Sequence, residues 1–178
     1  MGFQDAEIFF GGTNMLKILP LEKTDATCIV RWNNEKSANF LQQWAGRGYE
    51  YPITEKQIIN RLDVEASSNY KVYKIVLHDD MIGTIELMNI DNEAKTAVVG
   101  RFLLNPEFTG RGYGTEALTR FVAFVFNDFG LQKISLNVFD FNKSALRCYE
   151  KVGFKAVHKE IRPNGWVAIR MEIVNTVV

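Results

Sequence analysis

The sequence contains only two cysteines, Cys28 and Cys148, among 178 residues. Two cysteines do not form the disulfide framework of a small secreted domain, so we interpret both as reduced, small apolar residues. No run approaches the ~18–20 apolar residues that a membrane-spanning helix needs. The N-terminus carries Asp5 and Glu7 and lacks the basic start of a signal peptide. We therefore expect a cytoplasmic protein that does not associate with membranes.

Neither sign of charge is in excess, because 21 Lys and Arg residues balance 21 Asp and Glu residues. This balance argues against nucleic acid as a partner, and an acidic ligand would have to be held by local groups. Hydrophobic residues make up 47% of the chain, which suffices for a packed core. Because no repeat or linker divides the sequence, we predict one domain over residues 1–178, with 1–14 as a peripheral segment.

The pattern of apolar residues and turn signals predicts an α/β sandwich around a mixed sheet. Short turns between the first three central strands indicate an antiparallel meander. The aromatic-rich segment Ser37–Tyr51 is expected to be a structured loop, and the last strand an exposed end strand able to pair between subunits. Strands are expected over Met15–Pro20, Lys71–Leu77, Met81–Ile90, Lys95–Leu104, Lys133–Phe139, Phe154–Ile161 and Trp166–Val174. Helices are expected from Thr24 to Asn34, after the capping signature Thr54–Gln57, over Gly112–Asp128 and over Asn142–Val152.

A glycine-rich turn connects the predicted strand ending at Leu104 to a helix. Gly110, Gly112 and Gly114 let backbone N–H groups approach an anion, and a helix N-terminus favours negative charge. Arg111 adds a side chain suited to a phosphate. The spacing lacks the Gly-Lys pair of a P-loop and differs from the dinucleotide fingerprint Gly-x-Gly-x-x-Gly. The turn thus indicates a phosphate site of another kind, or only an ordinary connection into the helix.

The helix predicted from Asn142 carries the second informative pattern. Asn142 and Tyr149 are seven positions apart, which places them on nearly the same face about 10.5 Å apart along the axis. Both side chains can therefore contact one elongated ligand. The alternatives are that Asn142 only caps the helix and that Tyr149 only packs in the core.

Together, the two segments resemble the GNAT superfamily of acetyl-CoA-dependent N-acetyltransferases. That family has the pattern Gln/Arg-x-x-Gly-x-Gly/Ala and later Asn-x-x-Ala-x-x-x-Tyr-x-x-x-Gly-Phe. The matching residues are Gly112, Gly114, Asn142, Ala145, Tyr149, Gly153 and Phe154. Thr109 departs from the pattern, since the family usually has Gln or Arg there. The layout is similar to the branch of ribosomal-protein N-terminal and spermidine acetyltransferases, and implies a mostly antiparallel sheet of about seven strands with helices on both faces.

The resemblance implies that an amine attacks acetyl-CoA directly, through a tetrahedral intermediate and without a metal. Backbone groups of Phe102, Leu103 and Leu104 would pair with the pantetheine arm, and one N–H would polarise the carbonyl. Asn142 would bond to the pantetheine, and Tyr149 would be the general acid to the CoA thiolate. The pyrophosphate would be held by the turn, namely Thr109, Gly110, Arg111, Gly112, Tyr113, Gly114 and Thr115.

Glu86 is our candidate for the general base, because it interrupts the alternation of its strand; the alternative is a solvated charge on one sheet face. Arg101 either points into the site or extends from the sheet face to solvent. The expected acceptor is a small-molecule amine or a protein N-terminus, and a homodimer is possible. A polyamine would need acidic groups, and those of the region are spread out: Glu35, Glu50, Glu55, Asp63 and Glu65.

An aromatic cluster in the N-terminal half either lines the acceptor site or forms a small core of its own. Its members are Phe40, Trp44, Tyr49 and Tyr51. Two other functional classes also fit the sequence patterns. One is a non-catalytic regulatory module that binds acyl-CoA, and the other is a nucleotide-binding adaptor.

Overall fold

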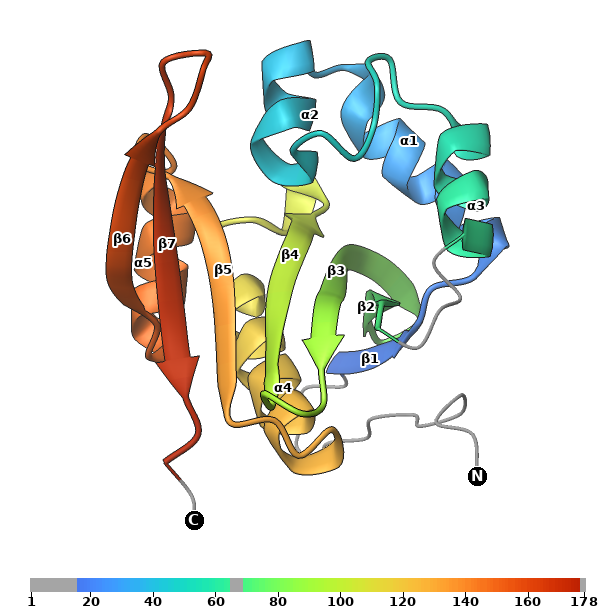
Figure 1. Cartoon of the computed structure of the whole chain (residues 1–178). Helices are drawn as coiled ribbons and strands as arrows, with labels where there is room; N and C mark the ends of the chain where they lie inside the picture. Colours follow the sequence, from blue (N-terminus) through green and yellow to red (C-terminus); the bar gives the residue numbers. More distant parts are fainter. Residues whose placement is uncertain (1–15, 65–68, 177–178) are drawn as a thin grey trace.

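The computed structural model of the chain describes residues 16–64 and 69–176, and within them a seven-stranded sheet dominates (Figure 1). Its strands are β1 Leu16–Pro20, β2 Lys71–Leu77, β3 Asp80–Asp91, β4 Thr96–Leu104, β5 Lys133–Phe139, β6 Lys155–Ile161 and β7 Val167–Val174. The α-helices are α1 Ala26–Asn34, α2 Ala38–Ala45, α3 Glu55–Val64, α4 Tyr113–Asp128 and α5 Lys143–Val152; η1 Lys23–Asp25 and η2 Pro106–Phe108 are 3-10 helices. The segment 1–14, predicted to be peripheral, lies outside the described residues.

The strands lie in the order β1-β2-β3-β4-β5-β7-β6. Strands β1 to β4 pair antiparallel, which confirms the meander, and the pair β4–β5 is parallel. Strand β7 pairs antiparallel with both β5 and β6. The expectation that the last strand is an exposed end strand is therefore wrong. Because the hairpin folds back, β7 fills the space between β5 and β6, and β6 forms the sheet edge with all seven residues exposed.

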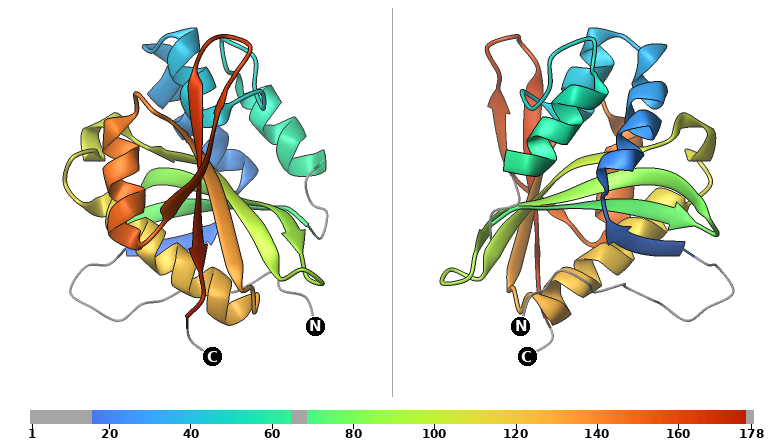
Figure 2. Two further views of the ribbon diagram at one scale, coloured as in Figure 1. Left: turned by 60° about the vertical axis from the view of Figure 1, so that its left-hand side comes forward. Right: turned by 90° about the vertical axis from the view of Figure 1, so that its right-hand side faces the viewer.

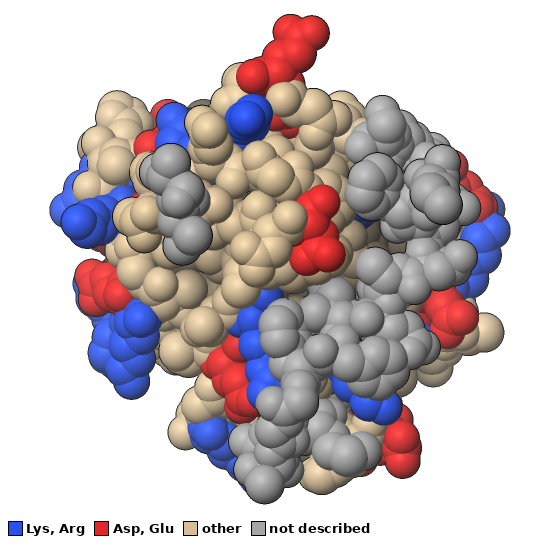
Figure 3. Space-filling view, turned by 90° about the horizontal axis from the view of Figure 1, so that it is seen from below, with Lys and Arg blue, Asp and Glu red and all other residues tan. Residues whose placement is uncertain are grey.

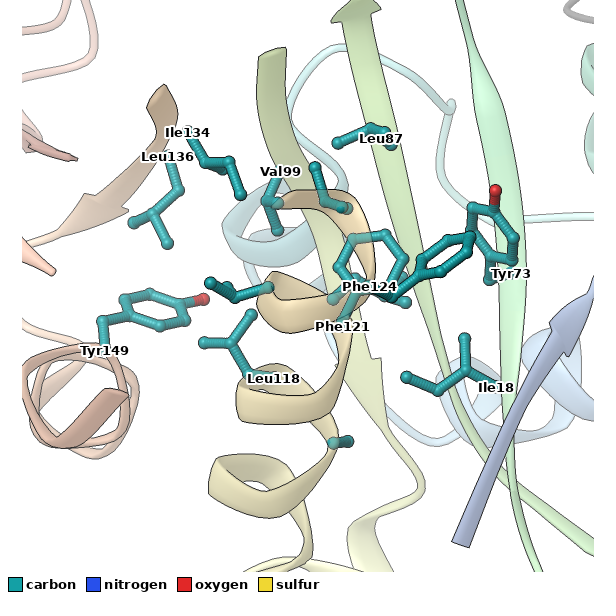
Figure 4. Packing of buried hydrophobic residues seen from close by; sticks show 14 of the residues in the cluster. Ile18, Tyr73, Leu87, Val99, Leu118, Phe121, Phe124, Ile134, Leu136 and Tyr149 are labelled. Atoms are coloured by element: carbon teal, nitrogen blue, oxygen red, sulfur yellow. The ribbon is translucent and has the colours of Figure 1, made fainter. Parts of the chain in front are cut away.

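Helices cover both faces of the sheet, as predicted, and the right-hand view of Figure 2 separates the two groups. Helices α4 and α5 pack on one face, where Phe121 and Val125 of α4 are fully buried against the strands (Figure 4). Helices α1, α2 and α3 form a second core on the opposite side, around Ile29, Leu41 and Ile58. The apolar stripe of each helix faces its own core, which is how amphipathic helices bury area on a two-sided sheet.

The N-terminal helices differ from the sequence prediction at two points. The first helical turn is η1, and its box joins Glu22 and Asp25, so Thr24 is not the cap. The segment expected to be a loop contains α2, because the Ser37 hydroxyl accepts a hydrogen bond from the Phe40 N–H at 3.2 Å and caps a helix. Gly46, at φ 60°, then ends that helix in a conformation that favours glycine.

Charged groups on the surface do not separate by sign over the face drawn in Figure 3, where basic and acidic side chains are interspersed. This agrees with the balanced composition. None of the helices in residues 16–64 and 69–176 is both long and apolar enough to cross a membrane.

Candidate functional site

The turn before α4 has the geometry of an anion site. Gly110 and Gly112 adopt φ of 74° and 87°, and a Cβ added at either would meet nothing within 4 Å. Gly112 caps α4 and offers no side-chain acceptor to the helix. The first N–H groups of α4 have no partners within the helix and carry its positive dipole end. The turn can therefore present backbone N–H donors to an anion, and its role as a phosphate site stays a prediction.

Strands β4 and β5 separate next to this turn. They pair only from Thr96 with Lys133 to Val98 with Ser135, and Figure 1 shows them diverging beyond that point. Arg101 has a φ of 43°, and the register with β3 shifts there, so β4 bulges. The edge of β4 that β5 leaves unpaired within the described residues can bond an extended ligand.

A cleft of about 420 Å³ lies between the separated strands and helices α4 and α5. It brings together most residues that the sequence analysis selected: Phe102, Leu104, Thr109, Gly110, Gly112, Gly114, Thr115, Asn142 and Tyr149. Four selected residues do not line it. Leu103 points to the opposite core, Glu86 lies behind Arg101, and Arg111 and Tyr113 both lie against the ring of Phe108.

Tyr149 is buried between α5 and the sheet and lines the cleft. Figure 4 shows its ring extending from α5 toward Leu118 of α4 and Leu136 of β5. The ring also contacts Phe154 at a centroid distance of 6.2 Å. Burial raises the pKa of the Tyr149 hydroxyl above its ordinary value, and the charge of Cys148 acts in the same direction. Tyr149 is thus both a core residue and a neutral hydroxyl at the cleft wall.

Asn142 and Thr109 use one polar atom each inside the protein. The Asn142 carbonyl oxygen accepts a hydrogen bond from the Ala145 N–H at 3.2 Å, so it caps α5. The Thr109 hydroxyl donates to the Pro106 carbonyl at 2.8 Å and closes η2. Thr109 therefore stabilises the approach to the glycine turn. At position 109, the chain lacks the longer Gln or Arg side chain that the family usually has.

The structure adds two cations to the cleft that the sequence analysis missed. Arg147 and Lys151 line it from successive turns of α5, and neither forms a salt bridge within the described part of the chain. A sequence signal was available, because Arg147 and Lys151 are four positions apart and follow Ser144 by three and seven positions. This spacing places all three residues on one face of the helix. Between Arg147 and Lys151 lies Cys148, whose pKa is raised by burial against the opposing effects of Thr115 and Lys151. The described cysteines are free, as predicted.

Glu86 is the partner of Arg101 in a buried cluster beneath α2. Arg101 Nη1 lies 2.5 Å from Glu86 Oε2 and 2.7 Å from the Tyr70 hydroxyl, which also donates to Glu86. Glu86 is 2% exposed, so the alternative of a solvated charge is wrong. Arg101 Nε donates to the Ala45 carbonyl at 3.1 Å, which fixes the end of α2 above the cleft. Arg101 thus lines the cleft at the bulge, while its guanidinium is held by Glu86, Tyr70 and the end of α2.

The family match agrees with this geometry. Residues 16–155 match the acetyltransferase (GNAT) domain, which is most of the chain. The chain belongs to the GNAT acetyltransferase family. It is therefore an acyltransferase of the N-acetyltransferase class, and its family uses acetyl-CoA.

Three related proteins show how this GNAT domain compares with others. A probable N-acetyltransferase, YjcK, of Bacillus subtilis is 31% identical over 153 residues, which cover 80% of each chain. Spermidine N(1)-acetyltransferase of Escherichia coli K12 is 24% identical over 139 residues, covering 78% of this chain and 72% of that one. The spermidine N-acetyltransferase of Vibrio cholerae, solved with CoA and spermine, superposes with a TM-score of 0.78 at 22% identity, covering 89% and 95%. That superposition confirms the fold.

The charges of the GNAT cleft suit a cofactor as acidic as CoA. Three cations line it, Arg101, Arg147 and Lys151, and no Asp or Glu of residues 16–64 and 69–176 does. The glycine turn supplies N–H donors at one end, and the unpaired edge of β4 supplies backbone groups along its length. An extended molecule that bears phosphates at one end and amides along its arm fits this donor set.

Proposed function

We propose that the chain transfers the acetyl group of acetyl-CoA to a primary amine, with the cofactor lying in the cleft beside α4 and α5. The observation that carries this proposal is that one cleft joins the N-terminus of α4 to the unpaired edge of β4. The segment Gly110–Thr115 would hold the pyrophosphate. Backbone groups of Phe102 and Leu104 would bond to the pantetheine arm, and an N–H of this edge would polarise the thioester carbonyl.

Tyr149 is the proposed general acid. Its raised pKa keeps the hydroxyl protonated before the reaction, and its proton would pass to the CoA sulfur as the carbon–sulfur bond breaks. The proton that the nitrogen loses on becoming an amide restores the phenol, and the free thiol leaves. Asn142 uses its carbonyl oxygen in the cap, which leaves its amide N–H groups as the donors to the pantetheine.

The general base at Glu86 stays a prediction. Its carboxylate lies against the Arg101 guanidinium, and Glu86 does not line the cleft, whereas Arg101 does. This placement favours a positioning role, in which Glu86 holds the Arg101 side chain at the end of β4. Removal of the proton from the amine would then fall to water in the cleft.

The acceptor is proposed to be a small-molecule amine or a protein N-terminus. Spermidine is the substrate named for two of the relatives, and these differ from the chain at three of every four aligned positions. Homo-oligomerisation is also proposed, because the edge strand β6 is exposed along its whole length and a Vibrio cholerae relative is described as dodecameric.

Thermal unfolding with CoA, ATP and NAD in parallel tests the cofactor. A ligand at ~100 times its Kd adds about 2.7 kcal/mol to the free energy of unfolding. We expect a shift with CoA alone, whereas a shift with ATP or NAD instead supports a nucleotide-binding adaptor. Thiol release from acetyl-CoA with a panel of amines then separates an enzyme from a regulatory module that only binds acyl-CoA.

A further inference from the structure

A second cleft, of about 520 Å³, continues from the first through the gap between β4 and β5. Gly100, Arg101 and Asn137 line both clefts, so the two meet at the point where the strands separate. The second cleft is bounded by α2 on one side and by the loop between β6 and β7 on the other, and Figure 1 shows both rising above the ends of β4 and β5. Under the proposed function, the acceptor would reach this junction through the second cleft.

The lining of this second cleft is basic. Arg47, Arg101 and Arg162 contribute to it, and no Asp or Glu in the described ranges 16–64 and 69–176 does. Arg47 and Arg162 are exposed near its mouth, and Arg101 is at its inner end. Arg162 also bonds Glu160 at 2.8 Å, and Arg101 bonds Glu86, yet both carboxylates lie outside the lining. The charged residues of the described lining are therefore all basic, and Arg47 has no salt bridge among those described.

The acidic residues considered for a polyamine site lie outside both clefts wherever the structure describes them. Glu35 lines a separate cavity beside Arg31, Glu50, Glu55 and Asp63 line neither cleft, and Glu65 lies outside the described residues. A polyamine carries several positive charges, and like charges in a confined cleft repel. The lining thus disfavours a polycation and favours a ligand with negative charge.

The same charges assist the chemistry. An amine must be neutral to attack a thioester, and a nearby cation lowers the pKa of a bound ammonium group. Arg101 at the junction would act in this direction on an amine that lies next to it, and its ion pair with Glu86 reduces the size of the effect. The methylene portion of an acceptor would pass Trp44 and Phe139, which supply apolar wall to both clefts.

We infer that the acceptor is an amine that also carries an anionic group, a carboxylate or a phosphate, which Arg47 and Arg162 bind while the amine reaches Arg101. The inference rests on the proposed function and narrows its substrate class. Free amino acids and acidic peptide N-termini share this chemistry, so the test treats them as separate arms.

Matched acceptors test the charge preference by thiol release from acetyl-CoA. In the small-molecule arm, 4-aminobutyrate, butylamine and putrescine differ only at the end remote from the amine. O-phosphoethanolamine and ethanolamine form the phosphate pair, and the peptides Ala-Glu-Ala-Ala and Ala-Lys-Ala-Ala form the peptide arm. In at least one arm, we expect kcat/KM to be highest for the acceptor with the anionic group and lowest for the most cationic member of that arm. The differences should shrink with added salt.

The double variant Arg47→Glu/Arg162→Glu should reverse the order. Two reversed charges near the cleft mouth should lower kcat/KM about tenfold for the anionic acceptor and raise it about as much for the cationic one. Arg31→Glu, an exposed change on α1 outside both clefts, is the control and should leave the order unchanged.

The outcomes distinguish failure of the anionic-acceptor inference from failure of the proposed function. Faster turnover of putrescine or spermidine than of every anionic amine overturns this inference and leaves the proposed function standing. The same holds if no anionic amine is acetylated by protein that CoA still stabilises against heat. Absence of both a CoA shift and any acetylation overturns the proposed function, and this inference with it.

Discussion

Arg101 Nη1 and Glu86 Oε2 lie 2.5 Å apart, although the two residues come from different strands and fifteen positions separate them in the chain. The bulge in β4 brings them together. Two steps along β3, from Thr84 to Glu86, are paired with three steps along β4, from Leu103 to Gly100. Gly48 packs directly against this pair: an added Cβ there would lie 2.4 Å from Arg101 Nε. The ion pair therefore has a fixed place between the second core and the clefts.

Glu86→Gln should destabilise the protein while leaving the acidic limb of the pH–rate profile unchanged. The substitution keeps the shape of the side chain but removes the charge opposite a buried guanidinium, which typically costs about 3 kcal/mol. Urea unfolding measures the loss. Disappearance of the acidic limb, with kcat reduced a hundredfold or more, would instead identify Glu86 as the general base.

A double variant serves as the control for this pair. Glu86→Gln/Arg101→Gln removes both charges, so no buried charge is left without its counterpart. We expect it to be more stable than Glu86→Gln alone. A double variant as unstable as the sum of the two single changes would show that the charges do not interact.

Tyr149→Phe should lower kcat by about 100-fold with little change in CoA affinity, because it removes only the proposed proton donor. Tyr73→Phe is the matched control: it removes a hydroxyl from another buried tyrosine of the same core, on β2 and outside the cleft. Burial raises the pKa of both hydroxyls. Equal kcat in the two variants, or unfolding of Tyr149→Phe, would favour a packing role.

Gly112→Glu should abolish CoA binding, because it places a side chain and a negative charge at the proposed pyrophosphate position. Its φ of 87° also adds strain of roughly 1 kcal/mol for a residue with a Cβ. Gly130→Glu is the control for strain and charge. Gly130 follows the C-terminal end of α4 and also has a positive φ, of 63°. Isothermal titration with CoA measures the affinity. Undiminished affinity in Gly112→Glu would move the pyrophosphate elsewhere.

Most helices and strands, and most residues that line the first cleft, were predictable because their signals are local. Gly112 at the start of α4, and Asn142 and Gly153 at the ends of α5, mark boundaries within a few residues of sequence. Helix α2 was missed because Gly46 and Gly48 near its end outweighed the cap at Ser37.

Residues that depend on packing were not predictable in the same way. Arg147 and Lys151 have the sequence of a solvated helix face, and only the packing of α5 beside α4 turns them to the cleft. The pairing of Glu86 with Arg101 needs the register of two strands and the bulge between them. Strand β7 lies inside the sheet because the β6–β7 hairpin places β7 next to β5. The order of the strands in the sequence does not specify which strand of the hairpin pairs with β5.

The pH dependence of turnover should show no loss of activity from Tyr149 in the working range. Because the raised pKa keeps the folded protein's phenol protonated, kcat/KM should keep rising as the acceptor amine deprotonates and should level off only above the pKa of that amine, ~10 for an alkylamine. The same shift favours the folded state below the ordinary tyrosine pKa, and this stability is lost only as pH rises beyond it. A decline near pH 8 that disappears in Tyr149→Phe would contradict the assignment.

The two cations of α5 give the sharpest test of where the cofactor phosphates lie. Arg147→Gln/Lys151→Gln should weaken CoA binding about tenfold and reduce its dependence on salt, since two partly exposed charges next to an anion contribute about 0.7 kcal/mol each. Lys143→Gln, on the same helix but outside the cleft, should change neither quantity. Titration of dephospho-CoA then assigns the contact: if the variant and the parent bind it equally, Arg147 and Lys151 contact the 3′-phosphate. If the tenfold difference persists, they contact the pyrophosphate next to the glycine turn, and equal affinity of both proteins for CoA itself would remove them from the site.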